Sequence, residues 1–391
     1  MSADARRILA VQALRAFVYG LGSVLIGVAL EHRGLSGTEV GAVLGALLAG
    51  SALVSVALAR HGDHIGRRRA YLILLAVMGG AGAVFASTGW LPALVLAGLT
   101  GTVSTDVVES GPFTSLEQAM LPEAAGERDP TRLFGAYNTV ATLAGSLGAL
   151  AAGATGLIGG ESERWLLAYP LAAAVAAAVA AGLSADVEPA APRSAGPRPA
   201  LHRSRGIVVR LSGLFALDSF GGGFVVQTFI AYWFARKFGT GPETLGLVFF
   251  AVGILQALSF QAAVRLAGRI GLLRTMVFTH LPSNVLLAAI AFAPSERVAI
   301  ALLLARFALS QMDVPTRQAY VVGVVEPDER TAAAAYTNTA RYVVRPVAPL
   351  LAGPLLQIAL GTPFLVAGAL KSAYDVGLYV LFRRVRLGDP D

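Results

Sequence analysis

The segment Ala13-Leu14-Arg15-Ala16-Phe17 recurs about 203 residues later as Ala216-Leu217-Asp218-Ser219-Phe220, with the residue types kept and the central charge inverted. A second set repeats at nearly the same offset: Gln118-Ala119, Ala136-Tyr137 and Ala141 are followed by Gln318-Ala319, Ala335-Tyr336 and Ala340. Chance explains two such echoes poorly. The chain is therefore predicted to contain a duplicated unit, with one copy in each half.

The composition places the chain in a lipid bilayer. Of its 391 residues 55% are hydrophobic and only 14% are charged, and the mean hydropathy is +0.65. A soluble protein of this size has fewer apolar and more charged residues. Because the sequence contains no cysteine, disulfides, thiol catalysis and cysteine-bound metals are excluded.

Twelve apolar stretches follow one another along the chain, and each is long enough to cross a hydrocarbon core of about 30 Å, which takes roughly 20 helical residues. They lie near residues 8–30, 38–59, 70–88, 91–112, 133–157, 164–184, 208–234, 242–264, 272–293, 297–323, 331–358 and 363–382. The alternating apolarity of an outer-membrane barrel strand is not seen. The sequence predicts an all-α membrane protein with six spanning helices in each half.

Arginine and lysine collect on one side of these spans. With a cytoplasmic N-terminus, twenty of them lie on the inner side and five on the outer side, namely Arg33, Arg164, Arg236, Lys237 and Arg297. Cytoplasmic loops are enriched in these residues, so both termini are expected in the cytoplasm and the protein in the inner (cytoplasmic) membrane. The net charge of +7 then reflects topology and attraction to anionic lipids, and no nucleic-acid partner is expected.

The two predicted bundles are joined by a basic linker. Between the sixth and seventh spans lie Pro189, Pro192, Pro197 and Pro199 among alanines and arginines, a mixture that cannot bury a core. We expect an N-terminal bundle at 1–184, a linker at 185–206 and a C-terminal bundle at 207–391. The first apolar stretch is long enough to span and is expected to remain as an uncleaved helix.

The loop between the second and third spans contains an acidic residue, a glycine turn and paired basic residues: Asp63, Gly66, Arg67 and Arg68 within residues 59–69. This pattern resembles the loop signature of the major facilitator superfamily, with Ala59 in place of the first glycine. The resemblance, together with the six-plus-six spans, identifies a twelve-helix member of bacterial type. It implies that Asp63 and Arg67 hold a cytoplasmic gate shut. The corresponding loop of the second half has Gly268 where Asp63 stands, so the second gate is expected to be degenerate.

Ionisable residues inside spans cost at least about 2.5 kcal/mol each at mid-helix and are candidate functional residues. Nine fall on predicted spans one, four, seven, ten and eleven, which the resemblance implies line a central cavity: Arg15, Asp106, Glu109, Asp218, Arg306, Asp313, Arg317, Arg341 and Arg345. Lys371 and Asp375, four residues apart on the twelfth span, are expected to neutralise each other as a structural pair.

Asp313 and Arg317 are also four residues apart, and Pro315 between them is expected to kink or loosen the tenth span. They form either a substrate, proton or gating site or an internal salt bridge. Arg341 and Arg345 share one helix face and repel each other, so they require carboxylates or an anionic ligand. An anion site and a closed ion-pair network both remain open.

Asp218 precedes three glycines, Gly221 to Gly223, each of which costs roughly 1 kcal/mol in helix propensity. A helix break or a close helix approach is expected there. Asp218 is either the carrier of a coupling proton or a latch paired with Arg15 or another cation.

The sequence excludes several activities. It has no nucleotide-binding loop, no metal-binding histidine pair and no nucleophile with a base, so neither an enzyme nor a bound cofactor is expected. The fourth-span arginine and the fifth-span glycine-proline signature of drug/proton antiporters of the superfamily are also missing.

The resemblance implies a monomeric secondary transporter that works by alternating access. Proton-coupled antiport that exports a small anionic or zwitterionic solute is expected. The alternatives are an ion-independent uptake facilitator and a non-transporting receptor or assembly factor with the same fold.

Overall fold

The computed structural model describes residues 2–104, 111–125, 130–158, 161–188, 201–326 and 329–385. At residues 59–64, 122–125, 130–135, 186, 322 and 331 it describes the backbone alone. The described residues form helices joined by short connections, with no strand among them. They divide into two compact units, one of Met1–Ala195 with Val226–Gly253 and one of Gly196–Val225 with Ile254–Asp391. We call these unit 1 and unit 2. The predicted division at the 185–206 linker stays a prediction.

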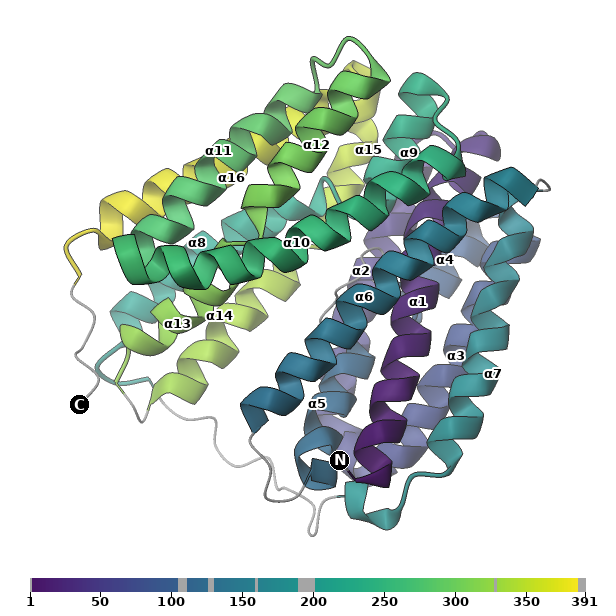
Figure 1. Ribbon diagram of the computed structural model, residues 1–391, viewed down its shortest axis with the longest axis horizontal. Helices are drawn as coiled ribbons and strands as arrows, with labels where there is room; N and C mark the ends of the chain where they lie inside the picture. The colour runs from purple at the N-terminus through teal and green to yellow at the C-terminus, as the bar shows by residue number, and fades with distance from the viewer. Residues whose placement is uncertain are drawn as a thin grey trace. The chain divides into compact units, whose positions relative to one another are not determined.

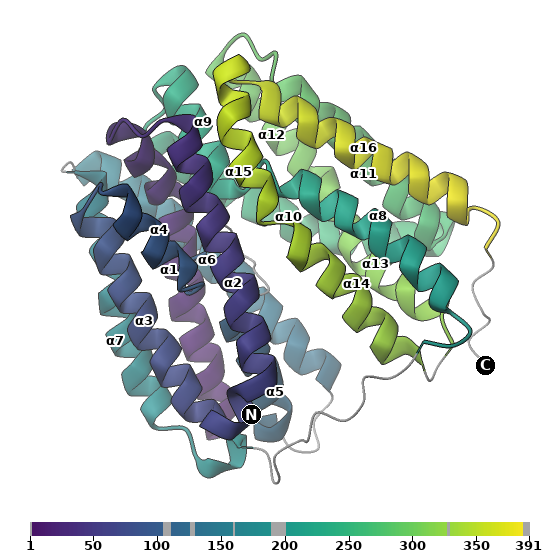
Figure 2. The ribbon, with the colours of Figure 1, turned by 180° about the vertical axis from the view of Figure 1, so that it is seen from behind.

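Figures 1 and 2 show the helices of both units. Unit 1 contains α1 (Ala3–His32), α2 (Gly37–Ile65), α3 (Arg67–Ser87), α4 (Leu91–Leu99), α5 (Pro112–Ala125), α6 (Pro130–Ile158), η1 (Ser162–Leu167), α7 (Ala168–Ala181), η2 (Ala185–Val187), α9 (Gln227–Phe238) and the first part of α10 (Pro242–Ile270). Unit 2 contains α8 (Arg205–Gly223), the rest of α10, α11 (Leu272–Ile290), α12 (Glu296–Ser310), α13 (Asp313–Gly323), α14 (Arg330–Val344), α15 (Val347–Ile358) and α16 (Thr362–Phe382).

The helices follow the predicted spans in order, which confirms an all-helical membrane protein. In the described ranges, nine helical segments are long and apolar enough to cross a membrane. The other three predicted spans are 91–112, which includes residues outside the described ranges, 272–293 and 331–358. The last two contain His280 and Asn284, and Arg341 and Arg345, whose polar side chains lower the mean hydropathy.

Two of the breaks inside predicted spans have clear causes. The seventh span is divided between α8, which ends at Gly223, and α9, which begins at Gln227. The tenth is divided between α12 and α13, and Pro315 lies in the first turn of α13, where a missing N–H is tolerated. The expectations of a glycine-associated break and of a loosened tenth span are both confirmed.

In unit 1, α1 packs against α6, α7 and α9 (Figure 1), and most of its residues are buried. Glycines make the contact with α6 possible. A Cβ added at Gly20 would lie 1.9 Å from the Gly145 carbonyl oxygen, and one at Gly148 would lie 1.8 Å from that of Phe17. Small residues at such crossings let helix backbones approach in a bilayer.

In unit 2, α8 packs against α14 and α16, and α11 packs against α12, α13 and α16 (Figure 2). Phe215, Tyr320, Tyr374 and Phe382 lie in the shared apolar core. A Cβ added at Gly221 would lie 2.8 Å from Cγ of Lys371, so the glycine lets α8 approach α16. The expected close approach at the glycine run is therefore also confirmed.

The third helix of each half begins after a glycine in the left-handed region. Gly66, with φ of 90°, precedes α3, and Gly271, with φ of 85°, precedes α11. Residues with a side chain rarely adopt this backbone conformation. The shared turn is structural evidence for the duplication.

Glu329 stabilises the segment that leads into α8. Its carboxylate accepts hydrogen bonds from the backbone N–H groups of His202, Arg203 at 3.0 Å and Ser204 at 2.8 Å. The Ser204 side chain and these N–H groups lower the pKa of the Glu329 carboxyl to about 2. The stabilisation is therefore fully present above the ordinary pKa of 4.5 and is lost as the pH falls toward about 2.

We predict that Glu329→Gln lowers the thermal unfolding temperature of the detergent-solubilised protein by a few degrees at pH 7. The difference from wild type should shrink below about pH 4.5. Thermal scans from pH 7 to pH 3.5 measure it. Glu326→Gln is the matched control, because Glu326 is exposed and takes part through its backbone: its N–H donates to Ser204 Oγ and its carbonyl accepts from the Glu329 N–H. An equal effect of both variants at every pH would contradict the role of Glu329.

Candidate functional site

A buried cluster of charged side chains lies in unit 2, centred on Asp218 of α8. Lys371 of α16 donates a hydrogen bond to Asp218 Oδ1, and Nη1 of Arg317 of α13 lies 3.5 Å from Asp218 Oδ2. Asp218 is 4% exposed. A carboxylate this deeply buried needs such cationic partners to remain ionised. The sequence left Arg15 or another cation as the partner of Asp218. The observed partners are Lys371 and Arg317.

Asp313 and Arg317 form the ion pair that their spacing allows. The Arg317 Nη1 to Asp313 Oδ2 distance is 2.8 Å, and both side chains are buried. Arg317 therefore bridges two carboxylates, Asp313 one turn away on α13 and Asp218 on α8.

Arg341 of α14 is the least well paired cation of this cluster. Its Nη2 lies 4.0 Å from Asp218 Oδ2, and within the described part of the chain its buried Nε has no hydrogen-bond partner. Its side chain is 29% exposed, compared with 7% for Arg317. Around Asp218, two carboxylates, Asp218 and Asp313, thus face three cationic side chains, Lys371, Arg317 and Arg341, while the third carboxylate of the cluster, Asp375, is bound by His280 and Asn284. The cation in excess is the one that solvent reaches.

Asp375 of α16 binds α11 and not Lys371. His280 Nδ1 lies 3.0 Å from Asp375 Oδ1, and Asn284 Nδ2 donates to Asp375 Oδ2 at 2.8 Å. The prediction of a Lys371–Asp375 pair is therefore wrong. The reason lies in the helix packing. At Gly221, α8 and α16 are close enough for Lys371 to reach α8. The twelfth span, which is not among the spans expected to line the cavity, contributes Lys371 and Asp375 to the cluster.

A second buried ion pair lies in unit 1. Arg15 Nη2 of α1 is 2.6 Å from Glu117 Oε2 of α5. Tyr71 of α3 donates to Glu117 Oε1 at 2.6 Å, and Tyr137 of α6 donates to Glu117 Oε2. Arg15 also donates to Gln12 and lies over the Phe113 ring, 4.9 Å from its centroid. Four helices thus meet at one carboxylate that is 0% exposed.

The two ion pairs occupy equivalent positions of the repeat with opposite polarity. Arg15 corresponds to Asp218, and the Gln-Ala echo aligns Glu117 with Arg317. Each half therefore joins its first helix to the second segment of its fourth span by an ion pair, Arg15–Glu117 or Asp218–Arg317. The charge inversion in the sequence is compensated by a second inversion about 100 residues later.

The predicted gating loop is held by a residue that the sequence did not single out. Glu188, just after η2, accepts from the N–H of Arg67 at 2.7 Å and of Arg68 at 3.0 Å. The Arg67 side chain donates to the carbonyls of Ala119 at 3.0 Å and Val187 at 3.4 Å. Arg68 donates to the carbonyl of Ala181. The loop is thus tied to α5 and to the chain after α7. The side chain of Asp63 lies outside the described residues.

Four other candidates lie outside these clusters or outside the described residues. Asp106 and Glu109 lie outside the described residues. Arg306 of α12 is buried, with its guanidinium carbon 4.5 Å from the Phe307 ring centroid. Arg345 lies half-buried at the break between α14 and α15, where its carbonyl oxygen would be 2.5 Å from a Cβ added at Gly223.

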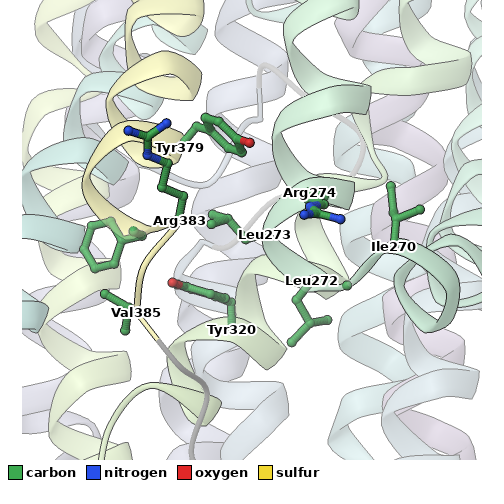
Figure 3. A pocket seen from close by; sticks show the side chains of 10 residues that line it. Ile270, Leu272, Leu273, Arg274, Tyr320, Tyr379, Arg383 and Val385 are labelled. Atoms are coloured by element: carbon green, nitrogen blue, oxygen red, sulfur yellow. The ribbon is translucent and has the colours of Figure 1, made fainter.

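A pocket of about 210 Å³ opens at the end of unit 2 where α11 begins and α16 ends (Figure 3). Its lining includes Arg274, Arg383, Tyr320 and Tyr379. Asp218, His280 and the other charged cluster residues are not among the lining residues. The pocket is therefore a separate feature from the charged cluster.

A family model for the Major Facilitator Superfamily matches residues 8–232, more than half of the chain. The chain belongs to the Major Facilitator Superfamily (MFS). An uncharacterized membrane protein of Saccharomyces cerevisiae is 25% identical over 422 aligned residues, covering 97% of this chain and 94% of the yeast protein. This relative does not support the predicted bacterial source.

Solved MFS transporters share the fold. The nucleoside transporter NupG superposes with a TM-score of 0.71 at 14% identity, over 98% of this chain and 99% of that chain. A D-xylose-proton symporter gives 0.74 at 14% identity, over 96% and 97%. The human organic anion transporter MFSD10 gives 0.61 at 18% identity, over 96% and 99%. By its membership of the family, the protein is an MFS transporter of small molecules and a multi-pass integral membrane protein, not an enzyme.

Sequence reasoning missed Glu117, Lys371, His280 and Asp375 as members of these two clusters. Glu117 falls beyond the predicted end of the fourth span. A signal for it was available, because it aligns with Arg317 through the repeated Gln-Ala. The spacing pairs Lys371 with Asp375, and His280 is not among the candidates taken from the sequence.

Proposed function

We propose that this MFS transporter moves small anionic or zwitterionic solutes by alternating access, coupled to protons. The observation that supports an anionic substrate is the excess of cations around Asp218. Arg341 is half-buried, solvent reaches it, and its nearest carboxylate oxygen is 4.0 Å away. A cation in that position gains most from an anionic ligand, since a charge removed from water needs a partner.

The same arrangement supports the proposed proton coupling. While Asp218 is ionised it occupies Lys371 and Arg317. Protonation of Asp218 removes that negative charge and leaves Lys371 able to attract an anion, whereas Arg317 keeps Asp313 at 2.8 Å. Proton and anion are then bound together, so the anion moves in the direction of the proton gradient. Export, the direction expected from the sequence, results where the compartment that supplies the anion is the more acidic one.

Several parts of the proposal rest on the sequence. Twenty arginines on one side against five cations on the other support cytoplasmic termini. We assign the protein to a cytoplasmic membrane, acting as a monomer, with bundles 1–184 and 207–391 that rock about the linker 185–206. The antiport expected from the sequence is the competing arrangement, in which proton and anion exclude each other.

The test is solute flux into proteoliposomes. Labelled lactate, succinate, glutamate and benzoate are compared with neutral xylose and uridine, with an acidic outside, an acidic inside or no gradient. An anion flux that follows the acid side supports the proposal. Flux opposite to the proton gradient indicates antiport, and flux indifferent to it indicates a facilitator. Flux of the neutral solutes alone would contradict the anionic substrate class.

We predict that Arg341→Gln lowers the flux of the transported anion by about tenfold or more. The substitution removes the cation of the cluster whose nearest carboxylate is 4.0 Å away and which solvent reaches. Arg341→Lys should retain part of the flux, since it keeps the charge but loses the guanidinium fork. Arg274→Gln, an exposed arginine of the separate pocket, is the matched control and should transport like wild type. Wild-type flux in Arg341→Gln would remove this residue from the site.

A further inference from the structure

His280 lies between two buried carboxylates from different helices of unit 2. Its Nδ1 is 3.0 Å from Asp375 Oδ1 on α16, and its Nε2 is 3.9 Å from Asp218 Oδ1 on α8. The exposed fractions of Asp375, His280 and Asp218 are 0%, 3% and 4%. The three side chains thus form a carboxylate–imidazole–carboxylate series that crosses from α16 through α11 to α8.

The Asp375–His280 contact contains one proton. At 3.0 Å a hydrogen bond joins the ring nitrogen to the carboxyl oxygen, so either Nδ1 donates to an ionised Asp375 or a protonated Asp375 donates to Nδ1. Asn284 supports both forms, because its amide N–H donates to Asp375 Oδ2 at 2.8 Å in either one. A carboxylate that is hydrogen-bonded to one ring nitrogen fixes the orientation of the imidazole.

Five helices surround His280 and its partners. The charged and titratable groups that face it or its partners are Asp218 on α8, Asp313 and Arg317 on α13, Arg341 on α14, and Lys371, Tyr374 and Asp375 on α16. From α12 the contact is the backbone carbonyl of Arg306, which accepts from Ser283. Of these groups, Asp218 is the one that Nε2 approaches and that also binds Lys371.

We propose that His280 stores the coupling proton and passes it to Asp218. The proton on Nε2 moves to Asp218 Oδ1, which leaves His280 neutral and Asp218 a carboxylic acid. The present 3.9 Å separation must shorten by about 1 Å to reach hydrogen-bond range for the transfer. The Nε2–H bond of His280 breaks and an O–H bond forms at Asp218 Oδ1, and no other covalent bond changes. Asp375 keeps the imidazole in place throughout, as the third group orients the base in other proton-transfer sites.

The transfer explains how a proton controls an anion site. Once Asp218 is neutral, Lys371 loses its ionised partner, and its charge becomes available to a solute. When the proton leaves, Asp218 binds Lys371 again. This inference rests on the proposed proton coupling and adds to it the residue that supplies the proton. His280 is a proton-storing residue and is not expected to touch the solute.

The probe for the test is the proton itself. Wild-type proteoliposomes on a solid-supported membrane are exposed to a pH jump with no solute, and the transient current is recorded as a function of pH. A wild-type current is expected. His280→Gln keeps an amide in place of the imidazole but cannot take up a proton, so its current should fall by about tenfold or more. His32→Gln, the same change at an exposed position at the end of α1, should leave the current unchanged.

Asp375→Asn tests the pH midpoint of the current, which would not change if His280 had a purely structural role. Asparagine keeps the hydrogen-bonded shape but removes the negative charge beside the imidazole, so the midpoint of the current should move to lower pH. Gel filtration and circular dichroism check that each variant is folded. If His280→Gln does not fold, a current and midpoint in Asp375→Asn equal to wild type overturn the inference.

The outcomes separate this inference from the proposed function. No current in the wild type, together with solute flux indifferent to pH, would overturn proton coupling and the role of His280 with it. A wild-type current that persists unchanged in folded His280→Gln would overturn the role of His280 alone.

Discussion

Glu117→Leu is expected to lower the free energy of unfolding of the detergent-solubilised protein by about 3–5 kcal/mol, the cost of leaving one partner of a buried ion pair behind. Glu117 is 0% exposed and accepts from Arg15, Tyr71 and Tyr137. The substitution leaves the Arg15 guanidinium, 5% exposed at the side chain, without a carboxylate. Unfolding by increasing amounts of SDS in mixed micelles measures the change.

A double-variant cycle identifies the cause. Arg15→Met should cost a similar amount, because it leaves the Glu117 carboxylate buried without its cation. Arg15→Met with Glu117→Leu should cost less than either single variant, since replacing a buried pair by apolar residues is often neutral or stabilising. Glu161→Leu is the matched control: its pair with Arg164 at 2.9 Å is exposed, so the expected cost is below about 1 kcal/mol. Additive losses in the double variant would contradict the ion pair as the source of stability.

The internal repeat was the most informative feature of the sequence. Residue identities alone indicated that the halves correspond, and the left-handed glycines before α3 and α11 agree with that correspondence. The charge inversion of Arg15 and Asp218 was visible, but its compensation at Glu117 and Arg317 was not recognised. The fourth span was expected to end near residue 112, while α5 continues to Ala125. Glu117 lies beyond that predicted end, and a charged residue outside a predicted span is expected to be exposed to solvent.

Partner choice inside unit 2 could not be deduced from spacing. Lys371 and Asp375 are four residues apart on one helix, where side chains are neighbours, yet each binds a different helix. Two tertiary facts decide this: α8 approaches α16 at Gly221, and α11 brings His280 and Asn284 to Asp375. Asp313 and Arg317 satisfied the same spacing rule and do form their pair. Spacing therefore gives permitted pairs, and helix packing selects among them.

For Arg341 and Arg345 of the eleventh span, the sequence left open an anion site or a closed ion-pair network. The structure bears on this choice for Arg341. Arg341 has a distant carboxylate and a buried Nε without a hydrogen-bond partner in the described part of the chain. A closed ion-pair network would have satisfied it. This combination of incomplete pairing and partial exposure favours a binding role for Arg341.

Asp218→Asn is expected to abolish the dependence of transport on the proton gradient. Asparagine has the shape of aspartate but cannot take up a proton, so the step that releases Lys371 no longer responds to pH. Gradient-driven accumulation of the transported anion should fall by about tenfold or more. Exchange of labelled for unlabelled anion across the same membrane should continue, because exchange requires no net proton movement. Accumulation and exchange in proteoliposomes, measured side by side, test this split.

Asp313→Asn is the matched control for that experiment. Asp313 is buried like Asp218 and binds the same arginine, but the ion pairs in the described residues join it neither to Lys371 nor to His280. Both variants remove one carboxylate from Arg317, so both should lower stability, whereas only Asp218→Asn should separate exchange from accumulation. Equal loss of accumulation and exchange in both variants would mean that Asp218 maintains the fold of the site and does not bind the proton. Loss of gradient dependence in Asp313→Asn alone would assign the proton to Asp313, which no ion pair among the described residues joins to His280.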